Sequence, residues 1–158
     1  RILRDEHRDV LQYGSAVKQF LIDSGCTLFK GMAFPDIARM QVDIETTELH
    51  WSGPDARIFL IACSDNRGRE EILFGDETEM LERLTALVRA WDPDVLEGHN
   101  LYGFDLPWIR ARARALGVPL TWGRDGSEVG VGQERNAAIG ANARPFTPHY
   151  VWGRHILD

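Results

Sequence analysis

Cysteine is scarce in this 158-residue chain, which contains only Cys26 and Cys63. The two residues lie far apart in the sequence and form no C-x-x-C pair, so the sequence indicates neither a disulfide framework nor a zinc knuckle. We expect both cysteines to be small hydrophobic residues of the core.

Long apolar runs and a targeting segment are absent as well. No stretch approaches the roughly 18 residues of a membrane span, and the polar residues 1–8 lack the apolar segment of a signal peptide. These absences predict a soluble, cytoplasmic protein with no membrane partner.

The chain also lacks an excess of positive charge. It has 24 acidic and 18 basic residues, which gives a net charge of −6. No overall positive field is therefore available to attract a polyanion. If nucleic acid is the substrate, the contact must be local and bridged by cations. The length and a hydrophobic content of 44% suffice for one substantial core.

Three consecutive segments have the side-chain patterns of strands. Residues 39–45 alternate strictly between apolar and polar side chains, which predicts a half-buried strand. Residues 57–63 are almost wholly apolar, which predicts a central strand buried on both faces. Residues 70–74 form the third strand, and the short connections predict an antiparallel meander.

Helical spacing of apolar residues follows the strands. The pattern predicts a helix that starts near Asp76 and ends before Pro93, then a second helix over residues 106–116. A short buried strand over residues 95–98 separates them. Another helix is predicted near the N-terminus, over residues 9–24.

The order β-β-β-α-β-α predicts an α/β fold with a mixed sheet, flanking helices and an N-terminal helical extension. We place the extension in residues 1–26 and the domain in residues 27–158. Residues 124–144, rich in Gly, Ala, Asn and charge, are predicted to be a long, partly mobile loop. Residues 150–157 regain strand character, and an end inside an apolar element predicts a domain truncated at its C-terminal end.

Asp43 and Glu45 lie two residues apart on the polar face of the first predicted strand. Such pairs are weak evidence alone, because chance gives roughly four of them in a chain this acidic. Their Cα atoms are about 6.7 Å apart in a strand, so a divalent cation fits between the carboxylates, which otherwise repel each other. The alternative is an exposed edge strand whose polar face is only solvated.

Asp105 adds a second acidic position. It follows the strand over residues 95–98 through a polar loop, and sites in α/β sheets lie at such strand ends. The alternative is that Asp105 only caps the helix that opens at Leu106. A cap does not explain Asn100 and Phe104, which complete the pattern N-x-x-x-F-D.

These residues resemble a known family. Residues 42–46, V-D-I-E-T, resemble the first motif, D-x-E, of the DEDD-type 3′→5′ exonuclease domain in family B DNA polymerases, and residues 98–107 resemble the second. The resemblance covers roughly residues 25–158. Other matching segments follow in the same order, namely residues 30–32, residues 91–95, and Gly153 and Arg154 with Asp158.

The resemblance implies an RNase H-like fold and hydrolysis of phosphodiester bonds at the 3′ end of single-stranded DNA, with RNA possible as a substrate. It also implies two divalent metal ions, Mg²⁺ or Mn²⁺. In that scheme Asp43 bridges both ions, Glu45 binds the ion that activates the attacking water, and Asp105 supports the ion that stabilises the leaving oxygen. A polymerase domain in the same parent chain is implied too.

The same resemblance assigns Asn100, Phe104 and Thr46 to the substrate. Phe104 would stack against a base, although a core aromatic is the alternative at that position. Leu49 and Trp51 lie near the first motif, and either a substrate contact or loop packing fits them.

The family's third motif, a Tyr with an Asp four residues later, is missing after Tyr13, Tyr102 and Tyr150. We therefore expect the parent sequence to continue past Asp158 and this segment alone to be weakly active or inactive. Asp158 as a substitute ligand is a minor alternative. Two other functions stay open, a non-catalytic RNase H-like module that binds nucleic acid and a free-standing exonuclease or ribonuclease.

Overall fold

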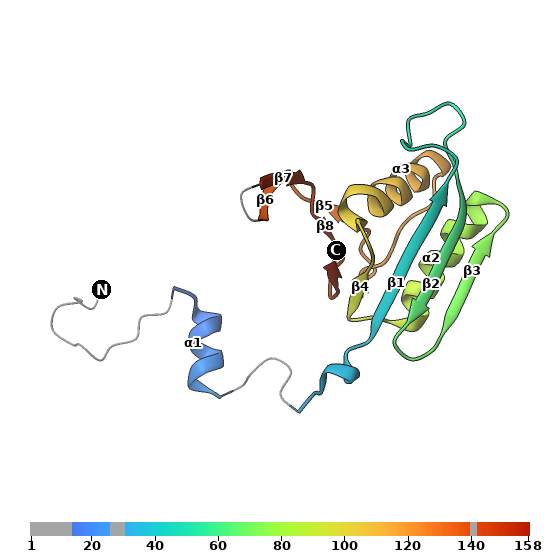
Figure 1. The fold of residues 1–158 in the computed structure, drawn as a ribbon. Coiled ribbons are helices and arrows are strands. Elements are labelled where there is room, and N and C mark those ends of the chain that lie inside the picture. Colours follow the sequence, from blue (N-terminus) through green and yellow to red (C-terminus); the bar gives the residue numbers. More distant parts are fainter. Residues whose placement is uncertain (1–13, 26–30, 140–141) are drawn as a thin grey trace. The chain divides into compact units, whose positions relative to one another are not determined.

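The computed structural model describes residues 14–25, 31–139 and 142–158, without the side chains of residues 137–144. It divides the chain into two compact units, Arg1–Asp36 and Ile37–Asp158. The described part of the first unit contains the helix α1 (Ala16–Asp23) and a short 3₁₀ turn, η1 (Phe34–Asp36) (Figure 1). The helix predicted over residues 9–24 is confirmed at Ala16–Asp23, where no residue is buried. Its first residues lie outside the described part, and the domain boundary after residue 26 stays a prediction.

The second unit is built on a five-stranded mixed sheet with the strand order β3-β2-β1-β4-β9 (Figure 1). Strand β1 pairs antiparallel with β2 and parallel with β4, and β9 adds a second parallel pair beside β4. The predicted meander and mixed sheet are confirmed. The strands are β1 (Arg39–Thr46), β2 (Ile58–Asp65), β3 (Glu70–Phe74), β4 (Val95–Glu97) and β9 (His155–Leu157).

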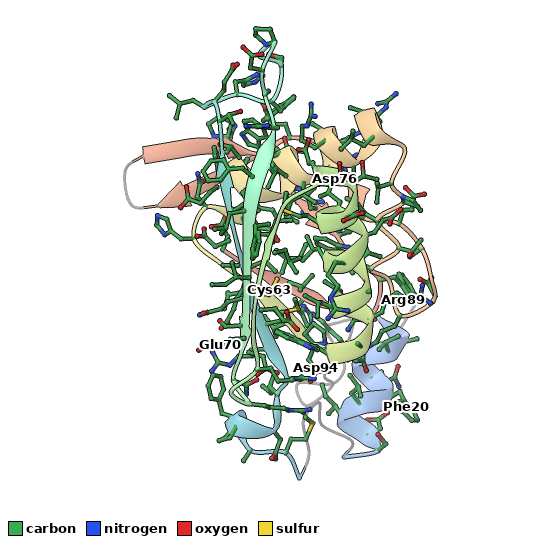
Figure 2. The ribbon with its side chains drawn as sticks, turned by 90° about the vertical axis from the view of Figure 1, so that its right-hand side faces the viewer. Phe20, Cys63, Glu70, Asp76, Arg89 and Asp94 are labelled. Atoms are coloured by element: carbon green, nitrogen blue, oxygen red, sulfur yellow. The ribbon has the colours of Figure 1, made fainter. Side chains whose placement is uncertain are left out.

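The buried side of the sheet packs with two helices, α2 (Glu77–Trp91) and α3 (Leu106–Leu116). Figure 2 shows α2 alongside the strands with side chains filling the space between them. Apolar residues of β1 alternate inward because side chains of a strand point to opposite faces. The core is centred on completely buried side chains from these elements, Met40, Ile61, Leu84 and Trp108.

Strand β2 differs from its prediction. Ile58, Ile61 and Cys63 are buried, but Phe59 is 45% exposed, so only one face of this inner strand is covered. An apolar run does not distinguish a strand buried on both faces from one whose second face is open. Cys63 is a free core residue, as predicted, and burial raises the pKa of its thiol to about 12. Cys26 lies outside the described residues.

The prediction of a loop over residues 124–144 is wrong. Much of the segment forms strands that pair in small two-stranded sheets. Its Ala-, Asn- and Gly-rich sequence has little of the β-branched and aromatic pattern that marks a strand, so no side-chain pattern predicts these elements. They are β5 (Gly130–Val131) with β8 (His149–Tyr150), and β6 (Arg135–Ile139) with β7 (Asn142–Phe146).

An arginine cluster joins the segment before β4 to the segment before β9. Arg154 donates hydrogen bonds to the Asp92 carboxylate at 2.7 Å and to the Pro93 carbonyl at 2.6 Å. Arg124 donates to the carboxylates of Asp92 and Asp94 at 2.9 and 2.8 Å, and these bonds hold the pKa of both acids below the usual range. These bonds hold the residues that precede β4 next to the residue that precedes β9. They therefore help to align the two neighbouring parallel strands.

Within the described ranges, none of the helices has the length and apolar character needed to cross a membrane.

Candidate active site

Asp43 and Glu45 lie on the open face of β1, where they alternate with the buried Val42 and Ile44. Both acidic residues are exposed. Because β1 is flanked by β2 on one side and β4 on the other, it is the central strand of the sheet. The alternative of an edge strand is therefore wrong, while a polar face that is only solvated still fits the exposure of both residues.

Asp105 lies beside the same strand. It is the last residue of a π-helical turn, η2 (Leu101–Asp105), and only 2% of its surface is exposed. Its Oδ1 atom accepts a hydrogen bond from the backbone N–H of Ile44 at 3.2 Å. The side chain makes no capping bond to α3. The helix-cap alternative is therefore wrong, and the contact joins the second sequence motif to the first.

The loop between β4 and Asp105 depends on two close approaches. A Cβ atom on Gly98 would lie 2.8 Å from the carbonyl oxygen of Val42, so only glycine lets this backbone pass so near β1. A Cβ atom on Gly103 would lie 2.3 Å from Oδ1 of Asn100. Asn100 has a φ of +63° and its carbonyl accepts the N–H groups of Gly103 and Phe104. Asn100 therefore starts the turn that presents Asp105.

Asp158 lies at the same end of the sheet. Its Oδ2 atom accepts the backbone N–H of Tyr102 at 3.0 Å, and the Tyr102 hydroxyl donates to the Ile156 carbonyl at 3.3 Å. The end of β9 thus holds the start of η2. An open hollow of about 780 Å³ lies at this end of the sheet, lined by Gln41, Val42, Asp43, Glu97, Gly98, His99, Leu157 and Asp158.

The charges of Asp43 and Asp158 act on Asp105. Burial is the largest cause that raises the pKa of Asp105 to about 6, and the two neighbouring carboxylates raise it further. Glu45 is not among these charges. Among the described residues, no three His, Cys, Asp or Glu side chains already form a ligand group for a metal ion. The structure therefore brings Asp43, Asp105 and Asp158 within electrostatic reach, but not into a finished metal site.

Comparison with known proteins identifies the family. Residues 53–158 match the model for the exonuclease domain of DNA polymerase family B. The chain belongs to this family. Asp105 and Asp158 lie inside the matched range, whereas Asp43 and Glu45 precede it.

Several archaeal DNA polymerases are similar to the chain. DNA polymerase 1 of Pyrococcus abyssi is 34% identical over 136 residues, which covers 76% of this chain and 17% of that protein. The DNA polymerase of Archaeoglobus fulgidus is 35% identical over 101 residues, or 62% of this chain and 13% of that protein. This chain therefore spans less than a fifth of the length of these relatives.

A solved structure supports the RNase H-like assignment of this exonuclease domain. The family B DNA polymerase of Pyrobaculum calidifontis superimposes with a TM-score of 0.60 at 29% identity, over 77% of this chain and 15% of that one. In this chain the mixed sheet with a central β1 positions Asp43.

The predicted substrate residues of this exonuclease domain occupy different environments. Phe104 packs partly buried against the core, with its ring centroid 6.1 Å from that of Trp108. The Thr46 hydroxyl donates to the Glu48 carbonyl at 2.7 Å, and Asn100 is exposed. The roles of Phe104, Thr46 and Asn100 in substrate binding stay predictions.

Leu49 and Trp51, the two residues near the first motif, differ in their exposure to solvent. Leu49 is 92% exposed, whereas Trp51 packs partly buried against the core and stacks on His50, with 4.1 Å between ring centroids. Trp51 packs its loop against the core and also lines the groove along α3, so both loop packing and a substrate contact still fit it, whereas Leu49 makes no such packing contact.

Sequence reasoning gave Asp158 too little weight. Asp158 follows directly on the short apolar strand β9, just as Asp105 follows β4 through a loop. The carboxyl ends of neighbouring parallel strands lie at one edge of a sheet. That rule, applied to the third parallel strand, would have placed Asp158 beside the other two acids.

Replacement of Asp105 by asparagine should stabilise the metal-free domain. The folded-state pKa of about 6 lies above the ordinary 3.8, so the folded protein binds this proton more tightly than the unfolded chain. The carboxylate therefore costs stability progressively as the pH rises from about 4 to about 6. We expect Asp105→Asn, which keeps an oxygen for the Ile44 N–H, to gain about 1–2 kcal/mol at pH 7 after allowance for solvent screening.

Urea unfolding at several pH values in EDTA measures this effect. The gain should shrink as the pH falls toward 4 and vanish below the unfolded-state pKa of 3.8, where both states of the wild type are protonated. Asp55→Asn, in an exposed turn, is the matched control and should change the free energy of unfolding by less than about 0.5 kcal/mol. A gain that is the same at pH 4 and pH 7 would contradict the electrostatic explanation.

Proposed function

We propose that this domain hydrolyses the terminal phosphodiester bonds of single-stranded DNA in the 3′→5′ direction with two divalent metal ions, Mg²⁺ or Mn²⁺. One observation carries the proposal. Asp105 is buried against the strand that bears Asp43. The charged groups that act on its carboxylate are other carboxylates, which repel it, and no cation among the described residues balances its charge. A buried charge without a counterion is costly, and acids with perturbed pKa values gather at functional sites.

The donor set fits a hard divalent cation. Asp43 and Asp105 offer carboxylate oxygens from neighbouring elements, and such oxygens favour Mg²⁺ or Mn²⁺ over soft metals. Glu45, on the same face of β1, would complete the set. When bound, such ions supply electrostatic stabilisation of the charge that develops on the phosphate and the leaving oxygen. Asp158 would hold the Tyr102 backbone and thereby the turn that carries Asp105.

A second function is favoured by one observation. Because the described residues hold no ready group of three metal-ligating side chains, a non-catalytic RNase H-like module that binds nucleic acid also fits the geometry. The two proposals differ in their response to Mn²⁺, since only the nuclease needs the carboxylates to bind it. We also propose that a polymerase domain lies in the same parent chain, because the relatives are DNA polymerases. For the same reason we propose DNA, and not RNA, as the substrate.

The direction and metal dependence of cleavage test the proposal. A single-stranded oligonucleotide labelled at its 5′ end is incubated with the full-length gene product in Mg²⁺, Mn²⁺ or EDTA. We expect a ladder of shortened, still labelled products with either metal and none in EDTA. Release of the 5′ label as a mononucleotide first, or equal cleavage in EDTA, would reject 3′→5′ metal-dependent hydrolysis. Binding without any cleavage would favour the non-catalytic module.

A further inference from the structure

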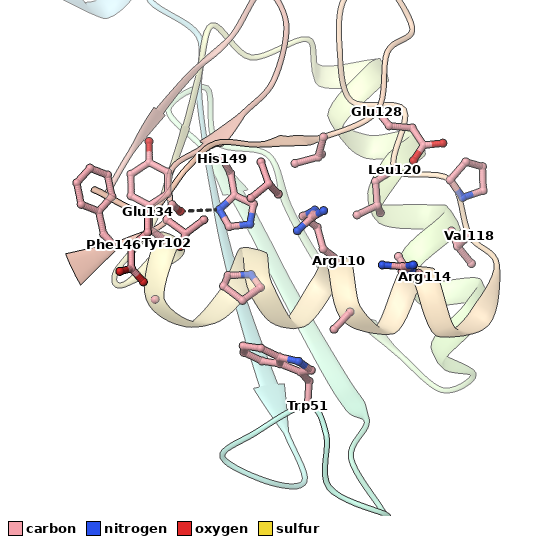
Figure 3. Close-up of a pocket in the computed structure, with 18 of the residues that line it drawn as sticks. Trp51, Tyr102, Arg110, Arg114, Val118, Leu120, Glu128, Glu134, Phe146 and His149 are labelled. Carbon is pink, nitrogen blue, oxygen red and sulfur yellow. Dashed lines mark hydrogen bonds between the residues drawn. The ribbon is translucent and has the colours of Figure 1, made fainter. Parts of the chain in front are cut away.

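A groove of about 980 Å³ runs along α3, apart from the hollow at the carboxylates. Its wall includes Tyr102 and Gly103 of η2, the turn that carries Asp105. It continues past Arg110 and Arg114 on successive turns of α3 (Figure 3). The groove therefore starts next to the segment that presents a candidate catalytic residue.

Two arginines in this groove have no acidic partner among the described residues. Arg110 and Arg114 are four residues apart on α3, so their side chains share one face of the helix. The arginine between them, Arg112, pairs with Glu77 at 2.7 Å, but neither Arg110 nor Arg114 forms an ion pair or donates a side-chain hydrogen bond in the described part of the chain. Burial and the charge of Arg114 lower the pKa of Arg110. An anion between the two guanidinium groups would offset this repulsion.

His149 adds a buried polar atom without a partner. The side chain is 3% exposed, and its Nδ1 atom lies 3.1 Å from the Thr147 carbonyl, to which it must donate. Its Nε2 atom is buried and has no hydrogen-bond partner among the described residues. Burial and the charge of Arg110 lower the pKa of the ring, so the ring is neutral, its proton lies on Nδ1, and Nε2 is a hydrogen-bond acceptor. Figure 3 shows the ring between Arg110 and the aromatic side chains of Tyr102 and Phe146. Buried polar atoms are nearly always bonded, so an unpartnered atom on a groove wall indicates a ligand position.

Aromatic rings continue the wall beyond His149. The ring centroid of Tyr102 lies 5.7 Å from that of Phe146 and 6.3 Å from that of His149. Bases of a single strand stack on such rings without regard to sequence. Glu128 and Glu134 also line the groove, but Figure 3 places them at its two ends. They confine an anion to the stretch between them, where the arginines and His149 lie.

We propose that Arg110 and Arg114 form a phosphate-binding site for the backbone of single-stranded DNA, that Nε2 of His149 accepts a hydrogen bond from a donor group of the same strand, and that Tyr102 and Phe146 form the adjacent base-stacking surface. The site is separate from the carboxylates and holds the strand upstream of the bond that is cleaved. The naming of DNA as the ligand rests on the proposed function. The local positive charge also explains how a chain with a net charge of −6 binds a polyanion.

Binding of a fluorescent oligothymidylate of about 12 nucleotides, measured by anisotropy in EDTA, tests this site. The full-length protein is compared with Arg110→Gln/Arg114→Gln and with a control, Arg67→Gln/Arg89→Gln, which removes two positive charges from exposed positions elsewhere. We expect the groove variant to bind about tenfold more weakly. For the groove variant, the slope of log affinity plotted against log salt concentration should become shallower by about 1.4. Each phosphate contact on a single strand contributes about 0.7 to this slope, and the variant loses two contacts. The control should change affinity less than about twofold.

Equal losses in both double variants, or no loss in either, would overturn the site. Inorganic phosphate is the second probe. If phosphate raises the unfolding midpoint of the wild type but not of the groove variant, while oligonucleotide affinity is equal in both, the groove binds free phosphate and the DNA proposal is wrong. The experiment needs no cleavage. If the protein binds DNA through these arginines but never cleaves it, the nuclease proposal is wrong and the groove site is still supported.

Discussion

Replacement of Asp43 and Glu45 by alanine in the full-length gene product is expected to lower metal-dependent exonuclease activity at least about a thousandfold. Both side chains lie on the open face of β1, and Asp43 acts electrostatically on the buried Asp105. Without them, only Asp105 remains of the three predicted ligands. The rate of loss of full-length, 5′-labelled oligonucleotide in Mg²⁺ and in Mn²⁺ measures the effect.

A matched control distinguishes the loss of these two side chains from the general effect of removing two negative charges. Glu79→Ala/Glu82→Ala removes two carboxylates from exposed positions of α2 and should leave the rate within about twofold. Since Asp43 and Glu45 are exposed, and the Asp43 charge disfavours the buried Asp105 carboxylate, their removal should not lower the unfolding midpoint. Undiminished cleavage by the Asp43 and Glu45 variant would remove these carboxylates from the reaction.

Replacement of Arg154 by alanine should destabilise the domain by about 3 kcal/mol, close to a hundredfold in the unfolding equilibrium. Its side chain is only 2% exposed. Its guanidinium donates to the Asp92 carboxylate and to the carbonyls of Pro93 and Trp122. Alanine would leave the Trp122 carbonyl without this donor, and the Asp92 carboxylate and the Pro93 carbonyl would keep only the bonds from Arg124. Urea unfolding of residues 1–158 gives the difference.

Lysine at position 154 should recover little of the loss, because an ammonium group cannot reach three acceptors with the planar geometry of a guanidinium. The control is Arg83→Ala, which breaks the exposed ion pair with Glu71 at 3.4 Å and should cost less than about 0.5 kcal/mol. Similar losses for Arg154→Ala and Arg83→Ala would show that the cluster does not hold β4 and β9 together.

Local sequence pattern predicted the elements that carry the site. Strict alternation placed Asp43 and Glu45 on the polar face of β1, and the strand, loop and helix pattern placed Asp105 at the entrance to α3. These features depend on side-chain period and on turn residues, which are properties of neighbouring positions. The family resemblance then indicated which elements lie together, and the strand order agrees with it.

The contacts that define the site could not be predicted in this way. The bond from Ile44 to Asp105 joins residues that are 61 positions apart, and it requires a π-helical turn that no periodicity marks. The i, i+4 spacing of Arg110 and Arg114 is visible in the sequence, but His149 reaches them only because β8 lies against the groove. Non-local packing determines both arrangements.

The central claim is that Asp43 and Asp105 bind divalent metal ions. Calorimetric titration of residues 1–158 with Mn²⁺, at a pH near 7.5 where Asp105 is ionised, tests it most directly. We predict saturable binding to the wild type and its loss in Asp43→Asn/Asp105→Asn, while the Glu79→Ala/Glu82→Ala control still binds. Equal Mn²⁺ binding by the wild type and the Asp43 and Asp105 variant would contradict the account.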